Sequence, residues 1–190
     1  MHKALRYPMR MTVRCKSQLI FVLGGASSGK SEAALRLATK GVRPTVSRAF
    51  VATGQALDKE MAERIARHRS SRPASWVTAE VPLDLTGWIE RHGREHRVIV
   101  VDCLTMWLSN QFGQGRVDAG IVQDMQGVLG AARRTRARIV LVANELGMGI
   151  VPGDAVSRRF REVAGTINQL IADESDETHL VVSGLSVRLK

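Results

Sequence analysis

The chain has few cysteines and few aromatic residues, and it has no long apolar run. Its two cysteines, Cys15 and Cys103, lack the spacing of metal ligands, and a disulfide between them is not expected. No run reaches the roughly 20 apolar residues that cross a bilayer, and the basic start lacks the apolar stretch of a secretory signal. These absences argue against a disulfide scaffold and a membrane-spanning protein, and they favour a protein of the reducing cytoplasm.

Acidic residues are also in deficit: 28 lysines and arginines face 18 aspartates and glutamates, which gives a net charge of +10. Such a balance suits a nucleic-acid partner, because basic side chains neutralise backbone phosphates. However, the basic residues are spread along the chain, and aromatic residues, which stack on bases, make up only 4%. We therefore interpret the surplus charge as solvated surface and expect no nucleic acid as the main partner.

What is present fits one globular domain. The chain has 190 residues, of which 44% are hydrophobic and 24% charged, so it can bury a full core and wholesale disorder is not expected. We find no repeat, low-complexity tract or linker to a second domain. We expect a basic, poorly ordered N-terminal extension over residues 1–18 and a single domain over residues 19–190.

Apolar runs and helical spacings alternate along that domain. Val/Ile-rich or otherwise apolar runs predict strands at 19–23, 47–52, 97–101, 138–143, 179–183 and 187–190. Helical spacing predicts helices at 31–40, 59–68, 84–92, 104–112, 121–136 and 157–173, with loops at 113–120 and 144–155 and a tight turn at 184–186. The alternation predicts an α/β fold with a mostly parallel sheet flanked by helices and an antiparallel hairpin at its C-terminal edge.

A glycine-rich phosphate-binding motif, the P-loop, follows the first predicted strand and precedes the first helix. It comprises Gly24, Gly25, Ala26, Ser27, Ser28, Gly29, Lys30 and Ser31. Its glycines let backbone N–H groups point at phosphate oxygens, and the helix directs its positive end at the same place. Lys30 is expected to reach the β- and γ-phosphates and Ser31 to offer its hydroxyl to Mg²⁺. A glycine-rich turn that binds nothing is the alternative, but the strand and helix on either side favour a nucleoside triphosphate site.

An aspartate closes the strand of nearly pure valine and isoleucine. Asp102 stands at the carboxyl end of that strand, where ligands bind in open parallel sheets. It could hold Mg²⁺ opposite Ser31, as the Walker-B acid of P-loop enzymes does, or it could cap the helix that begins near Leu104. We favour the metal role because a P-loop needs such a partner.

A histidine lies among arginines at the end of the predicted helix 59–68. Arg67, His68 and Arg69 are followed by Arg72 and Pro73. A neutral imidazole is a competent nucleophile, and flanking arginines attract phosphate and lower its pKa. On this pattern alone, a surface or helix-capping role for His68 is the stronger interpretation.

Several motifs together resemble a known family, the bifunctional adenosylcobinamide kinase / adenosylcobinamide-phosphate guanylyltransferases. The resemblance covers about residues 19–190, and its specific parts are the strings 64–73 (Arg-Ile-x-x-His-Arg-x-x-Arg-Pro) and 144–152 (Asn-Glu-Leu-Gly-Met-Gly-Ile-Val-Pro). Further matches are Val51-Ala52-Thr53-Gly54-Gln55, Trp76-x-Thr78-x-Glu80, Val101-Asp102-Cys103-Leu104-Thr105, Arg159-Phe160-Arg161, Gly165-x-x-Asn168-Gln169 and Val182-Ser183-Gly184.

The resemblance implies two reactions and a site for them. A nucleoside triphosphate, ATP or GTP, phosphorylates the hydroxyl of adenosylcobinamide, and GMP then passes from GTP through His68 to the phosphorylated corrinoid, giving adenosylcobinamide-GDP. By the same resemblance, the nucleotide is contacted by Ala52, Thr53, Gly54, Arg69, Ser70, Ser71, Arg72, Glu80 and Asp102. It also implies a RecA-like P-loop sheet, a homotrimer and a cytoplasmic enzyme that uses Mg²⁺.

The residue types suit that chemistry, with some alternatives open. Arg69 and Arg72 can hold triphosphate oxygens bidentately. Glu80 suits a guanine edge or a metal-bound water, and a solvated surface acid is the less favoured alternative. Arg67 brings like charge close to His68, so the site has to keep that imidazole neutral.

Other aromatic and histidine residues have plainer roles. We expect the three tryptophans to pack in the core rather than on the corrinoid or at a subunit interface, and His92, His96 and His179 to lie at the surface or at strand edges. Two functional alternatives remain, a different P-loop kinase with a structural His68 and a nucleic-acid-binding ATPase. The corrinoid-binding residues and the base for its hydroxyl have no signal in the sequence.

Overall fold

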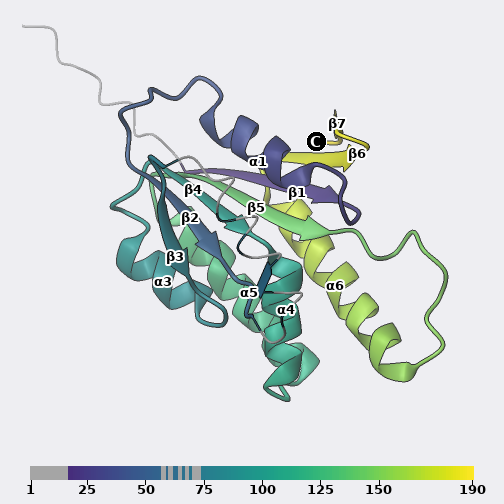
Figure 1. Cartoon of the computed structure of the whole chain (residues 1–190). Helices are drawn as coiled ribbons and strands as arrows, with labels where there is room; N and C mark the ends of the chain where they lie inside the picture. The colour runs from purple at the N-terminus through teal and green to yellow at the C-terminus, as the bar shows by residue number, and fades with distance from the viewer. Residues whose placement is uncertain (1–16, 57–58, 60–61, 64–65, 67–68, 70–73) are drawn as a thin grey trace, which may run out of the picture.

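The computed structural model describes residues 17–56, 59, 62, 63, 66, 69 and 74–190. These residues build one seven-stranded sheet in the order β3-β2-β4-β5-β1-β6-β7, with helices on both faces (Figure 1). Every neighbouring pair is parallel except β6 and β7, which run antiparallel. The predicted α/β fold with an antiparallel C-terminal pair is confirmed.

The strands are short, and the central ones are buried on both faces. Their bounds are β1 (Gln18–Gly24), β2 (Arg48–Ala52), β3 (Val77–Glu80), β4 (Val98–Asp102), β5 (Arg138–Asn144), β6 (Glu177–Val182) and β7 (Leu185–Arg188). Runs such as Val-Ile-Val-Val in β4 place branched side chains on both faces, as a sheet sandwiched between helices requires. The edge strand β7 is exposed throughout.

The described helices divide unequally between the two faces. Helix α1 (Lys30–Thr39) covers one face, and α3 (Leu85–His92), α4 (Leu104–Gly113), α5 (Asp118–Arg133) and α6 (Ala155–Glu174) lie on the other (Figure 1). Aspartate side chains begin two of them: Asp84 accepts the Gly87 N–H at 2.8 Å, and Asp154 accepts the Ser157 N–H at 2.8 Å.

Side chains alternate strictly between the two faces along each central strand. In β5, Val140 and Val142 belong to the cluster under α1, whereas Ile139 and Leu141 belong to the cluster under α3–α6. The same alternation holds in β1, β2 and β4, where Ile20, Val22, Phe50, Ala52, Val98 and Val100 face α1. This parity decides which strand-end residues share a face with the P-loop helix.

The structure differs from the predicted elements in three places. Strand β3 was not predicted, because its side chains are exposed or half-buried and show no apolar alternation. Helix α5 begins at Asp118 and ends at Arg133, earlier than the predicted 121–136, because Arg134 is already the C-cap. The hairpin turns at Ser183 and Gly184, not over 184–186, because both residues adopt positive φ (51° and 80°), as a two-residue turn between antiparallel strands requires.

Two histidines that were predicted to lie at the surface or at strand edges are buried. His96 is 8% exposed and its Nδ1 lies 2.7 Å from the Ser47 hydroxyl, while its ring stacks on Trp88. His179 is 7% exposed and lies between Glu177 and Ser186. Polar partners accompany this burial, at one ring nitrogen of His96 and at both ring nitrogens of His179.

The tryptophans are core residues, as predicted. Trp107 is fully buried and donates its indole N–H to the Leu83 carbonyl at 2.8 Å, Trp76 is buried under α1, and Trp88 packs against the larger cluster. Of the predicted helix 59–68, the described residues 59, 62, 63 and 66 are helical. Among the described helices, none combines the length and apolarity needed to cross a membrane.

Candidate active site

Four predicted site segments meet at the carboxyl edge of the sheet. In strand register, Ala52 pairs with both Asp102 and Glu80, and Gly24 pairs with Asn144. Because parallel strands lie about 4.8 Å apart, the ends of β3, β2, β4, β5 and β1 form one continuous edge. The P-loop, Ala52–Gly54, Glu80 and Asp102 therefore lie along the same rim.

The P-loop joins β1 to α1 in a tight curl. A Cβ on Gly24 would collide with the Ser28 hydroxyl and lie 2.6 Å from the Val181 carbonyl oxygen, so only glycine fits there. Gly29 is the N-cap of α1 with φ 85°, and no side chain caps the helix. The first backbone N–H groups of α1 thus stay available for an anion.

Lys30 lies within this curl. Its side chain is 8% exposed, and its Nζ donates to the Gly25 carbonyl oxygen at 3.0 Å. A phosphate oxygen in the curl would offer Nζ a charged acceptor in place of a neutral one, which strengthens the hydrogen bond.

The charges of Asp102 and Lys30 both act on the thiol of Cys103. Burial raises the pKa of the Cys103 thiol to about 11; the Asp102 carboxylate adds to the rise, while Lys30 acts in the opposite direction. Since Asp102 follows Val98 and Val100 by alternation, it points to the α1 face, where Lys30 and Ser31 begin the helix. Lys30, Ser31 and Asp102 therefore lie on the same face of the sheet.

Asp102 does not cap helix α4, which was the alternative role predicted for it. The N-cap of α4 is Cys103, and no side chain caps that helix. Among the described residues none donates a hydrogen bond to the Asp102 carboxylate. Asp102 is half-buried.

Thr53 ties the end of β2 to the end of β4. Its hydroxyl donates to the Cys103 carbonyl at 2.6 Å and accepts the Cys103 N–H at 3.0 Å, and its side chain is fully buried. The Thr53 carbonyl in turn accepts from the Asn110 side chain at 2.8 Å. Thr53 thus fixes the backbone beside Asp102, while Gly54, half-buried, leads away from the sheet.

Arg69 and Glu80 form an exposed ion pair. Arg69 Nη1 lies 3.4 Å from Glu80 Oε1, and the two side chains are 66% and 64% exposed. The pair is too exposed to stabilise the fold much, but it brings the residue that follows His68 in the chain to the carboxyl end of β3. The predicted nucleophile His68 and its neighbours Ser70, Ser71 and Arg72 lie outside the described residues.

The donor set suits Mg²⁺. Within the described ranges, no group of three or more His, Cys, Asp or Glu side chains could hold a metal by itself. Mg²⁺ prefers oxygen ligands, keeps several waters and shares its shell with substrate phosphates, so one hydroxyl (Ser31) and one carboxylate (Asp102) are a fitting protein contribution.

Asn144 has no role predicted from its sequence position, although the rule that singled out Asp102 applies to it. Asn144 is the polar last residue of a buried apolar strand, at the same edge of the sheet. Its backbone N–H donates to the Thr105 hydroxyl at 2.8 Å, and its carbonyl accepts from Asn168 Nδ2 at 3.2 Å.

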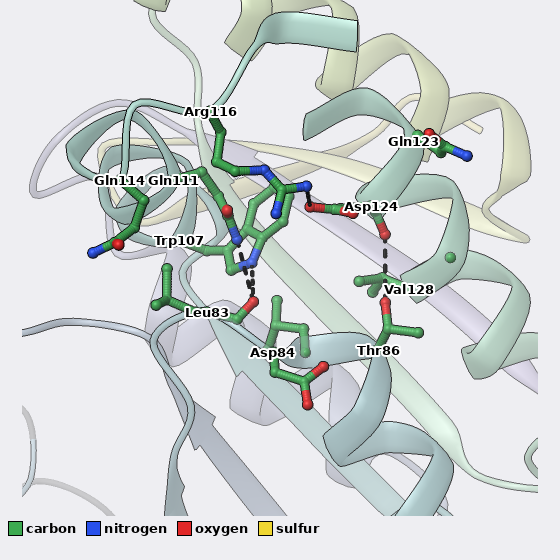
Figure 2. A pocket seen from close by; sticks show the side chains of 12 residues that line it. Leu83, Asp84, Thr86, Trp107, Gln111, Gln114, Arg116, Gln123, Asp124 and Val128 are labelled. Atoms are coloured by element: carbon green, nitrogen blue, oxygen red, sulfur yellow. Dashed lines mark hydrogen bonds and ion pairs between the residues drawn. The ribbon is translucent and has the colours of Figure 1, made fainter. Parts of the chain in front are cut away.

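A separate cavity of about 550 Å³ lies between α3, α4 and α5 (Figure 2). Its polar groups pair with one another: Trp107 and Gln111 both donate to the Leu83 carbonyl, and Arg116 pairs with Asp124 at 2.7 Å. No P-loop residue lines it, so it is not the phosphate site.

Sequence comparison finds close relatives of one kind. The profile of the family described as cobinamide kinase / cobinamide phosphate guanyltransferase matches residues 20–189. Over 184 residues, the chain is 39% identical to the bifunctional adenosylcobalamin biosynthesis protein CobU of Salmonella typhimurium, covering 90% of this chain and 99% of that protein. It is 40% identical over 172 residues to the bifunctional protein CobP of Pseudomonas aeruginosa, covering 89% and 95%.

Solved structures share the fold at low identity. The flagellar accessory protein FlaH of Methanocaldococcus jannaschii matches with a TM-score of 0.53 at 16% identity, covering 92% of this chain and 79% of that one. A KaiC-like protein of Pyrococcus horikoshii matches with a TM-score of 0.51 at 11% identity, covering 87% and 71%. These likenesses concern the fold alone.

Proposed function

The chain belongs to the family of cobinamide kinases / cobinamide phosphate guanyltransferases, and we propose that its P-loop edge holds the nucleoside triphosphate for this chemistry. It is a bifunctional enzyme of adenosylcobalamin biosynthesis, which phosphorylates adenosylcobinamide and then transfers GMP from GTP to give adenosylcobinamide-GDP. The observation that supports this site most is the placement of Lys30 and Ser31, at the start of α1, on the same face as Asp102.

For the kinase step, the backbone and the lysine of the P-loop have different roles. The backbone N–H groups of residues 24–29 surround the phosphates, and Lys30 binds the β- and γ-phosphate oxygens. Phosphoryl transfer needs mainly positioning and charge neutralisation from the protein, and a preformed curl with a buried lysine supplies both. ATP and GTP both fit this description, since the contacts are to phosphate.

The metal ligands in our proposal are Ser31 and Asp102. Mg²⁺ held by these two residues would neutralise charge on the phosphate oxygens. Thr53 keeps the backbone of the neighbouring Cys103 in place, which holds the Asp102 carboxylate towards the phosphates.

For the guanylyltransferase step, we assign the nucleophile to His68. Its ring nitrogen attacks the α-phosphorus of GTP, the bond to the β-phosphate oxygen breaks, and pyrophosphate leaves. The phosphorylated corrinoid then takes GMP from the histidine and regenerates it. Covalent catalysis of this kind divides one displacement into two easier ones.

Residues on the rim bind the rest of the nucleotide in this proposal. Arg69 and Arg72 bind phosphate oxygens, with Ser70 and Ser71 between them, and Ala52, Thr53 and Gly54 line the approach. Glu80 accepts from guanine N–H groups or a metal-bound water, and its ion pair with Arg69 supports a place beside the phosphates.

We also propose a cytoplasmic homotrimer. Exposed apolar side chains on the edge strand support a contact between subunits: Leu185 and Val187 are 73% and 56% exposed. A molar mass near three times 20.8 kDa by light scattering is the expected result.

Labelled GTP tests the transferase assignment directly. The wild-type enzyme with GTP labelled in the α-phosphate should form a covalent adduct that is stable in alkali and labile in acid, as a phosphoramidate is. His68→Ala should form none and should still phosphorylate adenosylcobinamide, because the kinase step attacks the γ-phosphorus. If His68→Ala is labelled as strongly as wild type, the assignment is wrong. Loss of phosphorylation in a folded His68→Ala variant would instead mean that the two steps share this residue.

A further inference from the structure

Asn144 closes β5, the strand between the P-loop strand β1 and the Asp102 strand β4 (Figure 1). It stands in register with Gly24, and Asp102 is in register with Val142, two residues earlier in β5. With parallel strands about 4.8 Å apart, Asn144 is one strand from the start of the P-loop and one strand from Asp102.

The alternation along β5 gives the direction of its side chain. Val140 and Val142 belong to the cluster under α1, so Asn144, the next residue of the same parity, also points to the α1 face. Asp102 shares that parity in β4. The Asn144 amide therefore points to the region that has Lys30 and Ser31 on one side and Asp102 on the other.

The backbone of Asn144 is held from two directions. Thr105, in the first turn of α4, accepts its N–H at 2.8 Å, and the buried Asn168 of α6 donates to its carbonyl at 3.2 Å. The following residue, Glu145, donates its N–H to the Gly24 carbonyl at 3.2 Å. Three distant segments of the chain thus fix this position.

Its side-chain oxygen, by contrast, has no hydrogen-bond partner within the described part of the protein. Asn144 Oδ1 is buried and accepts no hydrogen bond there. A buried amide with a structural role is normally paired, as Asn110 is, which donates to the carbonyls of Thr53 and Pro82. Since an unpaired buried acceptor lowers stability, a residue held this firmly and left unpaired fits a ligand contact better.

We propose that Asn144 contacts the γ-phosphoryl group of the bound triphosphate and the hydroxyl that attacks it. Its amide N–H donates to a γ-phosphoryl oxygen, and its Oδ1 accepts from the acceptor hydroxyl before transfer. The hydroxyl oxygen then bonds to the γ-phosphorus, the bond from that phosphorus to the β–γ bridging oxygen breaks, and the nucleoside diphosphate and a proton leave to solvent. The hydroxyl contact rests on the proposed kinase function, whereas the γ-phosphoryl contact needs only a bound triphosphate.

The test compares Asn144→Ala and Asn144→Asp with wild type and with Gln126→Ala, an exposed amide of α5 far from the loop. We expect both Asn144 variants to lower kcat of corrinoid phosphorylation about 100-fold, as the loss of one preorganised donor does. They should weaken binding of a non-hydrolysable triphosphate analogue about 10-fold and leave the Kd of the nucleoside diphosphate unchanged, because only the triphosphate has a γ-phosphoryl group. Asn144→Asp keeps the size of the side chain and serves if the alanine variant fails to fold.

The proposal is overturned if both nucleotides weaken equally, or if kcat in a folded variant stays within about 3-fold of wild type. If wild type itself does not phosphorylate the corrinoid, the proposed function fails, and the comparison of triphosphate with diphosphate still decides the role of Asn144.

Discussion

Gly184 donates its backbone N–H to the carbonyl oxygen of Ser28 at 2.9 Å, and so the turn of the C-terminal hairpin holds the P-loop. A Cβ on Gly29 would meet the Gly184 Cα at 3.2 Å, which shows how closely the two backbones approach. The phosphate site thus depends on a turn that belongs to neither β1 nor α1.

Replacement of Gly184 by alanine is expected to weaken nucleotide binding. Gly184 has φ 80°, a conformation that costs a residue with a Cβ about 1–2 kcal/mol, and relaxation of the turn would move the donor away from Ser28. Gly41→Ala is the matched control, because Gly41 has φ 69°, open space around it and no P-loop contact. Thermal unfolding should show similar losses for both variants, and titration with a triphosphate analogue should show weaker binding only for Gly184→Ala. Equal affinities would mean that the hairpin does not position the loop.

Lys30→Met tests the charge of the P-loop lysine while it keeps the packing of a buried side chain. Lys30 is 8% exposed and its Nζ already bonds to Gly25, so methionine can fill its place with little loss of stability. We expect the Kd of a triphosphate analogue to rise at least about 10-fold, which corresponds to about 1.4 kcal/mol. Lys40→Ala, an exposed lysine just after α1, should bind as wild type does. Similar affinities for Lys30→Met and Lys40→Ala would contradict the phosphate role.

His96 predicts a loss of stability in mild acid. Burial lowers the pKa of His96 below its ordinary value of 6.5, His92 acts in the same direction, and Glu95 opposes them. The unfolded chain therefore binds a proton more readily than the folded protein. The contribution of His96 is fully present above about pH 6.5 and is lost as the pH falls through that value.

The check is the difference in Tm between about pH 7.5 and pH 5.5, a window that spans the ordinary histidine pKa. His96→Gln should lose less Tm over this interval than wild type. An unchanged pH dependence in a folded His96→Gln variant would mean that this histidine does not titrate on unfolding.

Local sequence patterns predicted the centre of the fold well. The strands β1, β4 and β5 are continuous apolar runs, and a glycine-rich turn before a helix allows few alternatives, so β1, the P-loop and α1 were predicted within a residue or two. The edges were predicted poorly. β3 is held by its pairing with β2 and shows no apolar alternation. All side chains of β7 are exposed, so no buried face marks this strand in the sequence.

Contacts between distant residues explain the other misses. His96 is buried with its ring nitrogen hydrogen-bonded to the Ser47 hydroxyl, and no residue near His96 in the sequence predicts that partner. Asn144 gained a candidate role only when the strand order placed it between β1 and β4 and its amide proved unpaired. The identity of the P-loop could be read from a motif, but its neighbours along the rim had to come from the sheet.

The hydrogen bond between Gly184 and Ser28 has a consequence for the newly made chain. The P-loop leaves the ribosome early, but β5 and β6, the two strands that flank β1, and the turn that holds Ser28 are all translated much later. A partly synthesised chain therefore carries the full phosphate-binding motif without a surface that can shape it. We therefore expect a chain that ends before the hairpin to bind nucleotides more weakly than the full-length chain.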